Sequence, residues 1–200
     1  MSIDTGSLIL LLIFVFIILS IAIAYFVLAA RRQAWSQLAD RAGLTFEPGN
    51  FFGSGLSVSG VYLGHQLTLS TFTRSSGKSS TTYTRVVLFM NQQANLDLSL
   101  YTEGVFSKVG KMLGMQDIQT GDEALDQRYV IKGQPENLVV SILQSYDLHQ
   151  KLVEAPSLNI QVKGQEIVYE KRGVEQNENN LIALFDLLTS LSNAIERALH

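Results

Sequence analysis

The sequence predicts an α+β protein. An N-terminal transmembrane helix should be followed by one domain with a mainly antiparallel sheet of about seven strands, helices packed on it, and a long C-terminal helix. Three observations support this fold class. Residues 8–30 form an uncharged apolar run, residues 56–169 contain stretches that alternate apolar and polar side chains, and residues 181–199 repeat apolar side chains at helical spacing.

The apolar run, residues 8–30, is long enough to cross a membrane. As a helix it would measure about 34 Å, and the hydrocarbon core of a bilayer is roughly 30 Å thick. A cleaved signal peptide is disfavoured, because no Lys or Arg precedes the run and the run is too long. We therefore expect a permanent single-pass transmembrane helix after a short extracytoplasmic segment, residues 1–7.

The charges beside the run predict its orientation. Arg31 and Arg32 follow it directly, whereas Asp4 is the charged residue before it. The positive-inside rule then places the N-terminus outside the cytoplasm and residues 31–200 inside. Trp35 has two interpretations, an anchor at the membrane interface or a residue packed on the soluble domain.

The helix should continue past the membrane as a juxtamembrane helix, residues 31–43. Apolar residues recur at helical spacing up to Ala42, and Gly43 is a natural C-terminal stop. No Gly/Ser-rich linker follows, so the cytoplasmic domain, residues 44–200, should be held close to the membrane.

Alternation and turn residues predict the elements of this domain. Residues 46–55 read as a turn-rich loop. Strands are expected at residues 56–62, 66–72, 82–90, 96–101, 127–131, 158–162 and 166–169. Helices are expected at residues 105–113, at residues 135–146 with Pro135 in the first position and a further turn to 152, and at residues 181–199.

The segment Gly77-Lys78-Ser79-Ser80 is similar to the tail of a nucleotide-binding P-loop. The first glycine of that motif would fall where the chain has Phe72, and strand-forming residues follow instead of a helix. We therefore expect a polar hairpin loop and no nucleotide binding. Arg74, Lys78 and Arg85, in or beside this loop, are candidate contacts to anionic lipid head groups, and a solvated loop is the alternative.

Residues 117–126 contain an acidic cluster. Divalent cations need several oxygens at loop spacing, but the EF-hand spacing is absent, and Thr120 with Glu123 matches a capping box. A structural turn is therefore the favoured interpretation of Asp117–Asp126, and a cation site is the alternative.

Other signs of catalysis or cofactor binding are absent from the sequence. The chain has no cysteine, and His65, His149 and His200 lie at no metal-ligand spacing. No nucleophile motif occurs, and the net charge of −3 comes without the basic stripe of nucleic-acid-binding proteins. We expect a non-enzymatic domain with no catalytic residues, no metal, no cofactor and no nucleic-acid partner.

The C-terminal helix, Leu181–Leu199, has two interpretations. Its apolar residues follow the alternating 3-4 spacing of a coiled-coil seam, which would form a homodimer. Phe185 and Leu187 widen the apolar stripe, however, and a wide stripe favours burial on the parent domain. We favour burial and keep the dimer as the alternative.

A family resemblance rests on three groups of residues together with the terminal helix. They are Trp35–Ala39 with Gly43-Leu44, Ser59–Gly64, and Thr120–Asp122 with Leu125–Val130. Over most of residues 8–199 the chain resembles bacterial single-pass membrane proteins that carry a C-terminal soluble domain of unknown function. The resemblance implies a bacterial source and no assigned activity, and with the orientation above it predicts the inner (cytoplasmic) membrane.

Two functions are compatible with these features. The first is a membrane-anchored, non-enzymatic interaction or scaffold domain with a protein partner. The alternative is a membrane-tethered domain that binds a lipid or a small apolar ligand, because a curved sheet closed by a long helix can enclose a cavity.

The predicted orientation can be tested with a reporter fused after His200. A reporter that is active only in the cytoplasm should give a signal, and replacing Arg31 and Arg32 with Glu should weaken that signal because these residues supply the basic charge beside the helix. Digestion of residues 31–200 by protease added outside intact cells would contradict this orientation.

Overall fold

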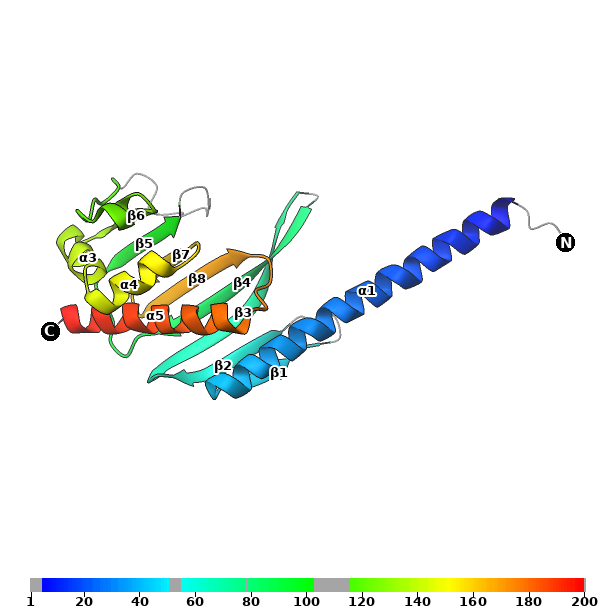
Figure 1. Ribbon diagram of the computed structural model, residues 1–200, viewed down its shortest axis with the longest axis horizontal. Helices are drawn as coiled ribbons and strands as arrows, with labels where there is room; N and C mark the ends of the chain where they lie inside the picture. Colours follow the sequence, from blue (N-terminus) through cyan, green and yellow to red (C-terminus); the bar gives the residue numbers. More distant parts are fainter. Residues whose placement is uncertain (1–4, 51–54, 78, 103–115, 200) are drawn as a thin grey trace.

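The computed structural model describes residues 5–50, 55–77, 79–102 and 116–199 (Figure 1). A long N-terminal helix, α1, leads into an α+β domain with an eight-stranded sheet. The strands lie in the order β1-β2-β3-β4-β8-β7-β5-β6, and every neighbouring pair is antiparallel. Their bounds are β1 Thr45–Pro48, β2 Leu56–Tyr62, β3 His65–Ser76, β4 Ser79–Phe89, β5 Asp97–Thr102, β6 Tyr129–Gln134, β7 Asn159–Lys163 and β8 Glu166–Arg172.

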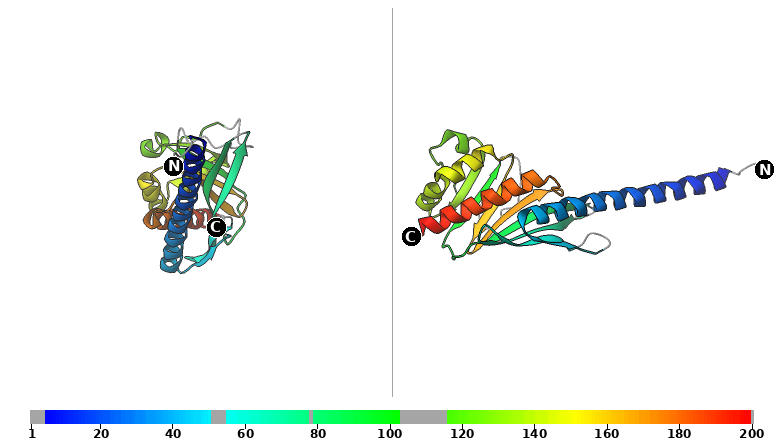
Figure 2. Two further views of the ribbon diagram at one scale, coloured as in Figure 1. Left: turned by 90° about the vertical axis from the view of Figure 1, so that its right-hand side faces the viewer. Right: turned by 60° about the horizontal axis from the view of Figure 1, so that its bottom comes forward.

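The helices of the domain cover one face of the sheet, and no helix of the described ranges covers the other, which we call the open face (Figures 1 and 2). The helices are α1 Thr5–Ala42, α2 Glu123–Asp126, α3 Glu136–Leu143, α4 Tyr146–Glu154 and α5 Glu178–Ala198. This confirms the predicted α+β class with an antiparallel sheet and a long C-terminal helix. The predicted helix at residues 105–113 falls outside the described residues.

Alternation of side chains explains why only one face is covered. In β3, Leu67 and Leu69 are completely buried, and in β4, Val86 and Leu88 are completely buried, whereas the residues between them face the open side. Successive side chains of a strand point to opposite faces, so this pattern makes one face apolar and the other mixed. The apolar face forms the core under α5.

One strand, β1, lies where the sequence predicted a loop, and it raises the number of strands above seven. It pairs with β2 through Thr45↔Ser59 to Pro48↔Leu56. The strand has four residues and ends in proline, and proline is tolerated in a sheet at an edge. A segment of four residues is too short to show an alternation of apolar and polar side chains. It is a strand because its backbone pairs with that of β2.

Helix α1 connects the apolar run to the core of the domain. Among the described residues it is the one helix long and apolar enough to cross a membrane, and none of its most apolar window is buried in the domain. Its last turns are different, because Trp35, Leu38 and Ala39 are buried in the core. The helix ends at Ala42, and Gly43 follows with a left-handed φ of 67°, as the sequence predicted.

Helix α5 packs on its own domain, against α1, α3 and α4. Phe185 is completely buried and meets the ring of Tyr62 edge-on, with the ring centroids 5.5 Å apart. The apolar residues of the predicted seam, from Leu181 to Ile195, are covered by the same chain. They therefore form no exposed seam for a homodimer in this fold.

Replacing Phe185 with Ala should lower the free energy of unfolding by roughly 3–5 kcal/mol, because the change leaves a large cavity in the core. The measurement is urea unfolding of residues 33–200, which keep Trp35 and Leu38, at two widely separated protein concentrations. The midpoint should not depend on concentration. A midpoint that rises with concentration and ignores the substitution would mean that α5 is a dimerisation element.

Candidate functional site

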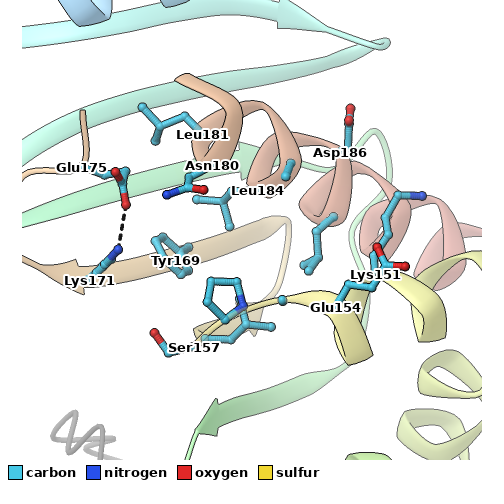
Figure 3. A pocket seen from close by; sticks show the side chains of 15 residues that line it. Lys151, Glu154, Ser157, Tyr169, Lys171, Glu175, Asn180, Leu181, Leu184 and Asp186 are labelled. Carbon is cyan, nitrogen blue, oxygen red and sulfur yellow. Dashed lines mark hydrogen bonds and ion pairs between the residues drawn. The ribbon is translucent and has the colours of Figure 1, made fainter. Parts of the chain in front are cut away.

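A cleft of about 410 Å³ lies between the first half of α5, strand β8 and the connection from α4 to β7 (Figure 3). This volume is within the range of small-molecule sites in proteins. The residues around it are Lys151, Glu154, Ala155, Pro156, Ser157, Leu158, Tyr169, Lys171, Glu175, Asn180, Leu181, Ala183, Leu184, Asp186 and Leu187.

The inner wall of the cleft is apolar. Leu181, Leu184 and Leu187 follow one another at three-residue spacing along α5, so they lie near one another on the helix, and all three are buried. Leu158 and Tyr169 close the opposite side and are also buried. An apolar group that enters the cleft would therefore contact the leucines of α5 on one side, and Leu158 with the ring of Tyr169 on the other.

Charged side chains surround the entrance. Lys171 Nζ lies 2.7 Å from Glu175 Oε2, and Lys151 Nζ lies 2.5 Å from Asp147 Oδ1 (Figure 3 shows the first pair). Asp186 accepts a hydrogen bond of 2.7 Å from the hydroxyl of Tyr62. The rim thus offers both signs of charge around an apolar interior, which suits an amphipathic ligand.

Tyr169 places a phenol at the inner wall. Burial, with a smaller contribution from the charge of Glu175, raises the pKa of Tyr169 to about 12, so its hydroxyl stays protonated at neutral pH. No hydrogen bond to this hydroxyl is found among the described residues. It is available to donate to a polar atom of a bound molecule.

Glu175 joins the cleft to α1. Its backbone carbonyl accepts a hydrogen bond of 2.9 Å from Trp35 Nε1, and Arg41 Nη1 donates to Asn179 Oδ1 at 2.7 Å. Trp35 follows the end of the apolar run, Ala30, by five residues, which is about 8 Å along a helix. The end of the cleft that carries Glu175 is therefore connected to α1 a short distance beyond the apolar run.

The orientation residues of the sequence analysis lie on this part of α1. Trp35 is completely buried, so it packs on the domain, which is the second of its two interpretations. Arg32 donates to the backbone carbonyls of Pro48, at 3.1 Å, and Asn50, at 2.5 Å, and so ties the end of β1 to the helix. Arg31 is half-buried beside it.

The hairpin formed by β3 and β4 brings Arg74 and Arg85 together, while Lys78 lies outside the described residues. Arg74 Nη2 is 2.6 Å from Glu170 Oε2, and Arg85 Nε is 3.9 Å from Glu170 Oε1. Gly77, with a φ of 58°, lies at the turn between two antiparallel strands and not at the start of a helix. This arrangement differs from that of a P-loop.

The acidic cluster forms a structural turn, with a different cap from the predicted one. Asp122, not Thr120, is the N-cap of α2, and its side chain accepts from the backbone amides of Ala124 and Leu125. The prediction of a Thr120–Glu123 capping box is therefore wrong, because Thr120 instead donates to Asp126 Oδ1 at 2.8 Å. Aspartate and threonine are both favourable N-cap residues, and here the Asp122 carboxylate accepts hydrogen bonds from two backbone amides.

Two further partners of this turn come from other elements. Lys132 Nζ lies 3.1 Å from Asp117 Oδ1, and His149 Nε2 lies 2.9 Å from Asp122 Oδ2. The backbone hydrogen bond from Leu125, together with His149, lowers the pKa of Asp122 despite partial desolvation. Within the described ranges, no group of three or more acidic, His or Cys side chains is arranged to hold a metal ion.

His65 is a buried residue with internal partners. Its Nε2 is 3.2 Å from Asn193 Oδ1, and its Nδ1 is 3.4 Å from both Asn91 Nδ2 and Ser192 Oγ. These contacts connect His65, at the start of β3, to α5. Because His65 and Ser192 are both buried, the imidazole is not accessible to a substrate.

The sequence does not predict the residues of the cleft. They come from three segments, 151–158, 169–175 and 180–187, and each segment alone has an ordinary core or surface pattern. One signal was Tyr169, a phenol at an inward position of a strand, because a buried tyrosine hydroxyl usually needs a polar partner.

Comparisons with known proteins add one finding about the fold. No protein-family model and no curated protein matches this chain. Among solved structures, the fold is similar to that of the mycobacterial trehalose monomycolate transport factor A, TtfA, with a TM-score of 0.57 and 9% sequence identity. The similarity covers 82% of this chain and 93% of that chain, and at this identity it shows a shared fold.

Replacing Glu175 with Gln should lower the free energy of unfolding at pH 7 by about 1–2 kcal/mol, because charged acceptors make the stronger hydrogen bonds. Burial alone would raise the pKa of Glu175, but the hydrogen bonds from Lys171 and from the amides of Asn177 and Gln176 lower it below its ordinary 4.5. The carboxylate therefore stabilises the fold above that pH and ceases to do so below it.

The difference between the wild type and Glu175→Gln in urea unfolding should accordingly shrink as the pH falls below 4.5. The control is Glu154→Gln, which removes the same charge from an exposed position on the other side of the cleft and should change the free energy little. If Glu175→Gln lowers the free energy of unfolding equally at every pH, the stabilisation does not come from the ionised carboxylate of Glu175.

Proposed function

We propose that this protein is a membrane-anchored, non-enzymatic domain that binds a lipid or another amphipathic molecule in the cleft between α5 and β8. The observation that carries the proposal is the contrast within the cleft. Its interior is lined by buried leucines and Tyr169, and its entrance carries Lys151, Lys171 and Glu175. Ligand sites are commonly apolar with a few polar groups that fix the orientation of the ligand.

The proposed binding mode follows from these groups. Hydrocarbon would lie against Leu184 and Leu187, where burial of apolar surface provides the main driving force. The hydroxyl of Tyr169 would donate to an ester or carboxyl oxygen, and the charges at the entrance would face the head group. Lys171 is partly occupied by Glu175, so an anionic head group would have to compete with that ion pair.

The fold similarity supports this class of ligand. The solved structure that shares the fold is a transport factor for trehalose monomycolate, by its title. Since sequence identity is 9%, the similarity supports a lipid-related role and does not transfer a particular substrate. The cleft beside Trp35 is the feature of this chain that such a role would use.

The anchor and its orientation are part of the proposal. We place residues 8–30 of α1 across a bacterial inner membrane, with the domain on the cytoplasmic side, because Arg31 and Arg32 follow the apolar run. Glu175, at one end of the entrance, would then lie within about 10 Å of the end of the apolar run, measured along α1 from Ala30. A lipid could reach such an entrance over a short path.

Interaction with a protein partner is the second candidate function. The observation that favours it is the open face of the sheet, which is not covered by any described helix (Figure 2). A scaffold function would need the outer surface of the domain and would not need an empty cleft.

Filling the cleft should reduce lipid binding. Ala183 lines the cleft and is exposed, so Ala183→Trp should occupy the space while the buried leucines stay in place. The full chain purified from native membranes should lose about ten-fold or more of its tightly bound lipid, measured by mass spectrometry after detergent washing. Such a loss corresponds to about 1.4 kcal/mol of binding free energy.

The matched control is Ala198→Trp, because Ala198 is also exposed and lies at the far end of the same helix. This variant should keep the lipid of the wild type, including lipid bound around α1. Equal amounts of lipid in both variants would refute the cleft as the site. A stoichiometric protein that co-purifies with all three chains would favour the scaffold function instead.

A further inference from the structure

The hairpin of β3 and β4 extends beyond the rest of the sheet as a two-stranded ribbon. Pairing of β3 with β2 ends at Ser70, and pairing of β4 with β8 ends at Thr84, apart from one bridge between Tyr83 and Gly173. The two strands of the hairpin remain paired with each other as far as Ser76↔Ser79. Figure 1 shows the ribbon projecting past the start of α5, toward the side on which α1 leaves the domain.

The ribbon has an unusual composition. Residues 71–85 contain three basic residues and no acidic residue, although the whole chain has a net charge of −3. Apart from Phe72, Tyr83, the basic residues and Gly77, every residue of this segment is Ser or Thr. The segment thus carries positive charge and hydroxyl groups at its tip and has no apolar side chain there to insert into hydrocarbon.

Aromatic stacking holds the base of the ribbon rigid. Phe72 and Tyr83 lie opposite each other in the register, and their rings stack with centroids 5.3 Å apart. The guanidinium of Arg74 lies 5.0 Å from both ring centroids, and that of Arg85 lies 6.0 Å from the Phe72 ring. A two-stranded ribbon is marginal by itself in water, so this stack accounts for its persistence.

The same stack presents positive charge on the open face of the sheet. The side chains of Arg74 and Arg85 are 49% and 42% exposed, and Arg172 at the end of β8 is exposed on the same face. Glu170 is the carboxylate paired with this group, and it neutralises one of the three charges. The arginines therefore keep a net positive charge that is accessible to solvent.

We propose that this ribbon is a second membrane contact, in which Arg74, Arg85 and Arg172 bind the head groups of anionic lipids and the hydroxyls of the tip lie among them. The inference rests on the proposed membrane anchor and not on the cleft. Each basic residue near an anionic surface favours contact by about five-fold. The contact is intramolecular once α1 is in the bilayer, so a weak intrinsic affinity suffices.

Nucleic acid is a poorer fit for the same charges. Even proteins that make about six to ten phosphate contacts lose roughly 10³- to 10⁵-fold in affinity for nucleic acid between about 50 and 200 mM salt. The ribbon and its base offer fewer basic groups, and Glu170 occupies part of them. The lipid surface also differs from nucleic acid in being always present beside an anchored domain.

The test uses the absence of cysteine from the chain. The full chain with Ser76→Cys, labelled at the ribbon tip with a polarity-sensitive dye, is reconstituted into vesicles of phosphatidylcholine, with or without about one third phosphatidylglycerol. The dye should be shielded from acrylamide on the anionic vesicles only, and 0.5 M salt, a concentration chosen to screen surface charge, should reverse the shielding. Flotation of the vesicles tests the anchor separately.

Variants connect the response to the arginines. Arg85→Gln with Arg172→Gln leaves Arg74 over its two rings and should reduce the population of shielded dye about five-fold for each charge removed. Lys163→Gln removes one charge from the end of the sheet opposite the ribbon and should have no effect. A dye on exposed Ser141, introduced by Ser141→Cys in α3, should not respond to anionic lipid.

The proposal is overturned if the dye at position 76 behaves alike on neutral and anionic vesicles, or if its response survives in the Arg85→Gln, Arg172→Gln variant. An equal response at position 141 would also overturn it, because the whole domain would then approach the membrane without orientation. Shielding that appears only when nucleic acid is added would assign the ribbon to that partner.

Discussion

The position of the domain relative to the apolar run depends on the last turns of α1. These turns are part of the long helix and also part of the core of the domain. The helix continues without a break from the apolar run to Ala42, and Trp35, Leu38 and Ala39 are buried in the core of the domain. A flexible linker between the apolar run and the domain would let the two rotate freely relative to each other. Here the indole of Trp35 also donates to the carbonyl of Glu175, so the direction of the helix and the position of the cleft are fixed together.

The cleft follows from how a one-sided sheet is covered. Helix α5 lies over the apolar face, where Leu188 and Leu191 are buried in the core, and its first half lines the cleft with Leu181, Leu184 and Leu187. Strand β8 forms the opposite wall and lies between β4 and β7, so its backbone is paired on both sides. The wall that carries Tyr169 is therefore held by two hydrogen-bonded neighbours. Both lysines at the entrance are paired with carboxylates, Lys171 with Glu175 and Lys151 with Asp147, so their charges are partly balanced without a ligand.

The parts of the fold that could be predicted from the sequence are those with a repeated local pattern. Strands such as β5 alternate in hydrophobicity, and α5 repeats its apolar residues, so both were found close to their observed bounds. Strand β1 was missed because four residues ending in Pro48 carry no pattern of their own. The cap of α2 was misassigned because Thr120 and Asp122 are both good capping residues. The bond of Thr120 to Asp126 within the turn and that of Asp122 to His149 on α4 decide between them. The cleft needs three segments to meet, which no local pattern encodes.

Strand β8 places the two candidate surfaces back to back. Tyr169 and Lys171 face the cleft, and the residues that alternate with them, Glu170 and Arg172, belong to the basic group on the open face. A one-residue shift in the pairing of β8 with β4 would exchange these two sets of side chains and disrupt both surfaces. The register between Arg85 and Glu170 therefore keeps the arginines on the open side and Tyr169 on the covered side. Because the last turns of α1 are buried in the domain, a contact of the ribbon with lipid would tilt α1 and the domain as one unit, and so set the direction in which the cleft opens.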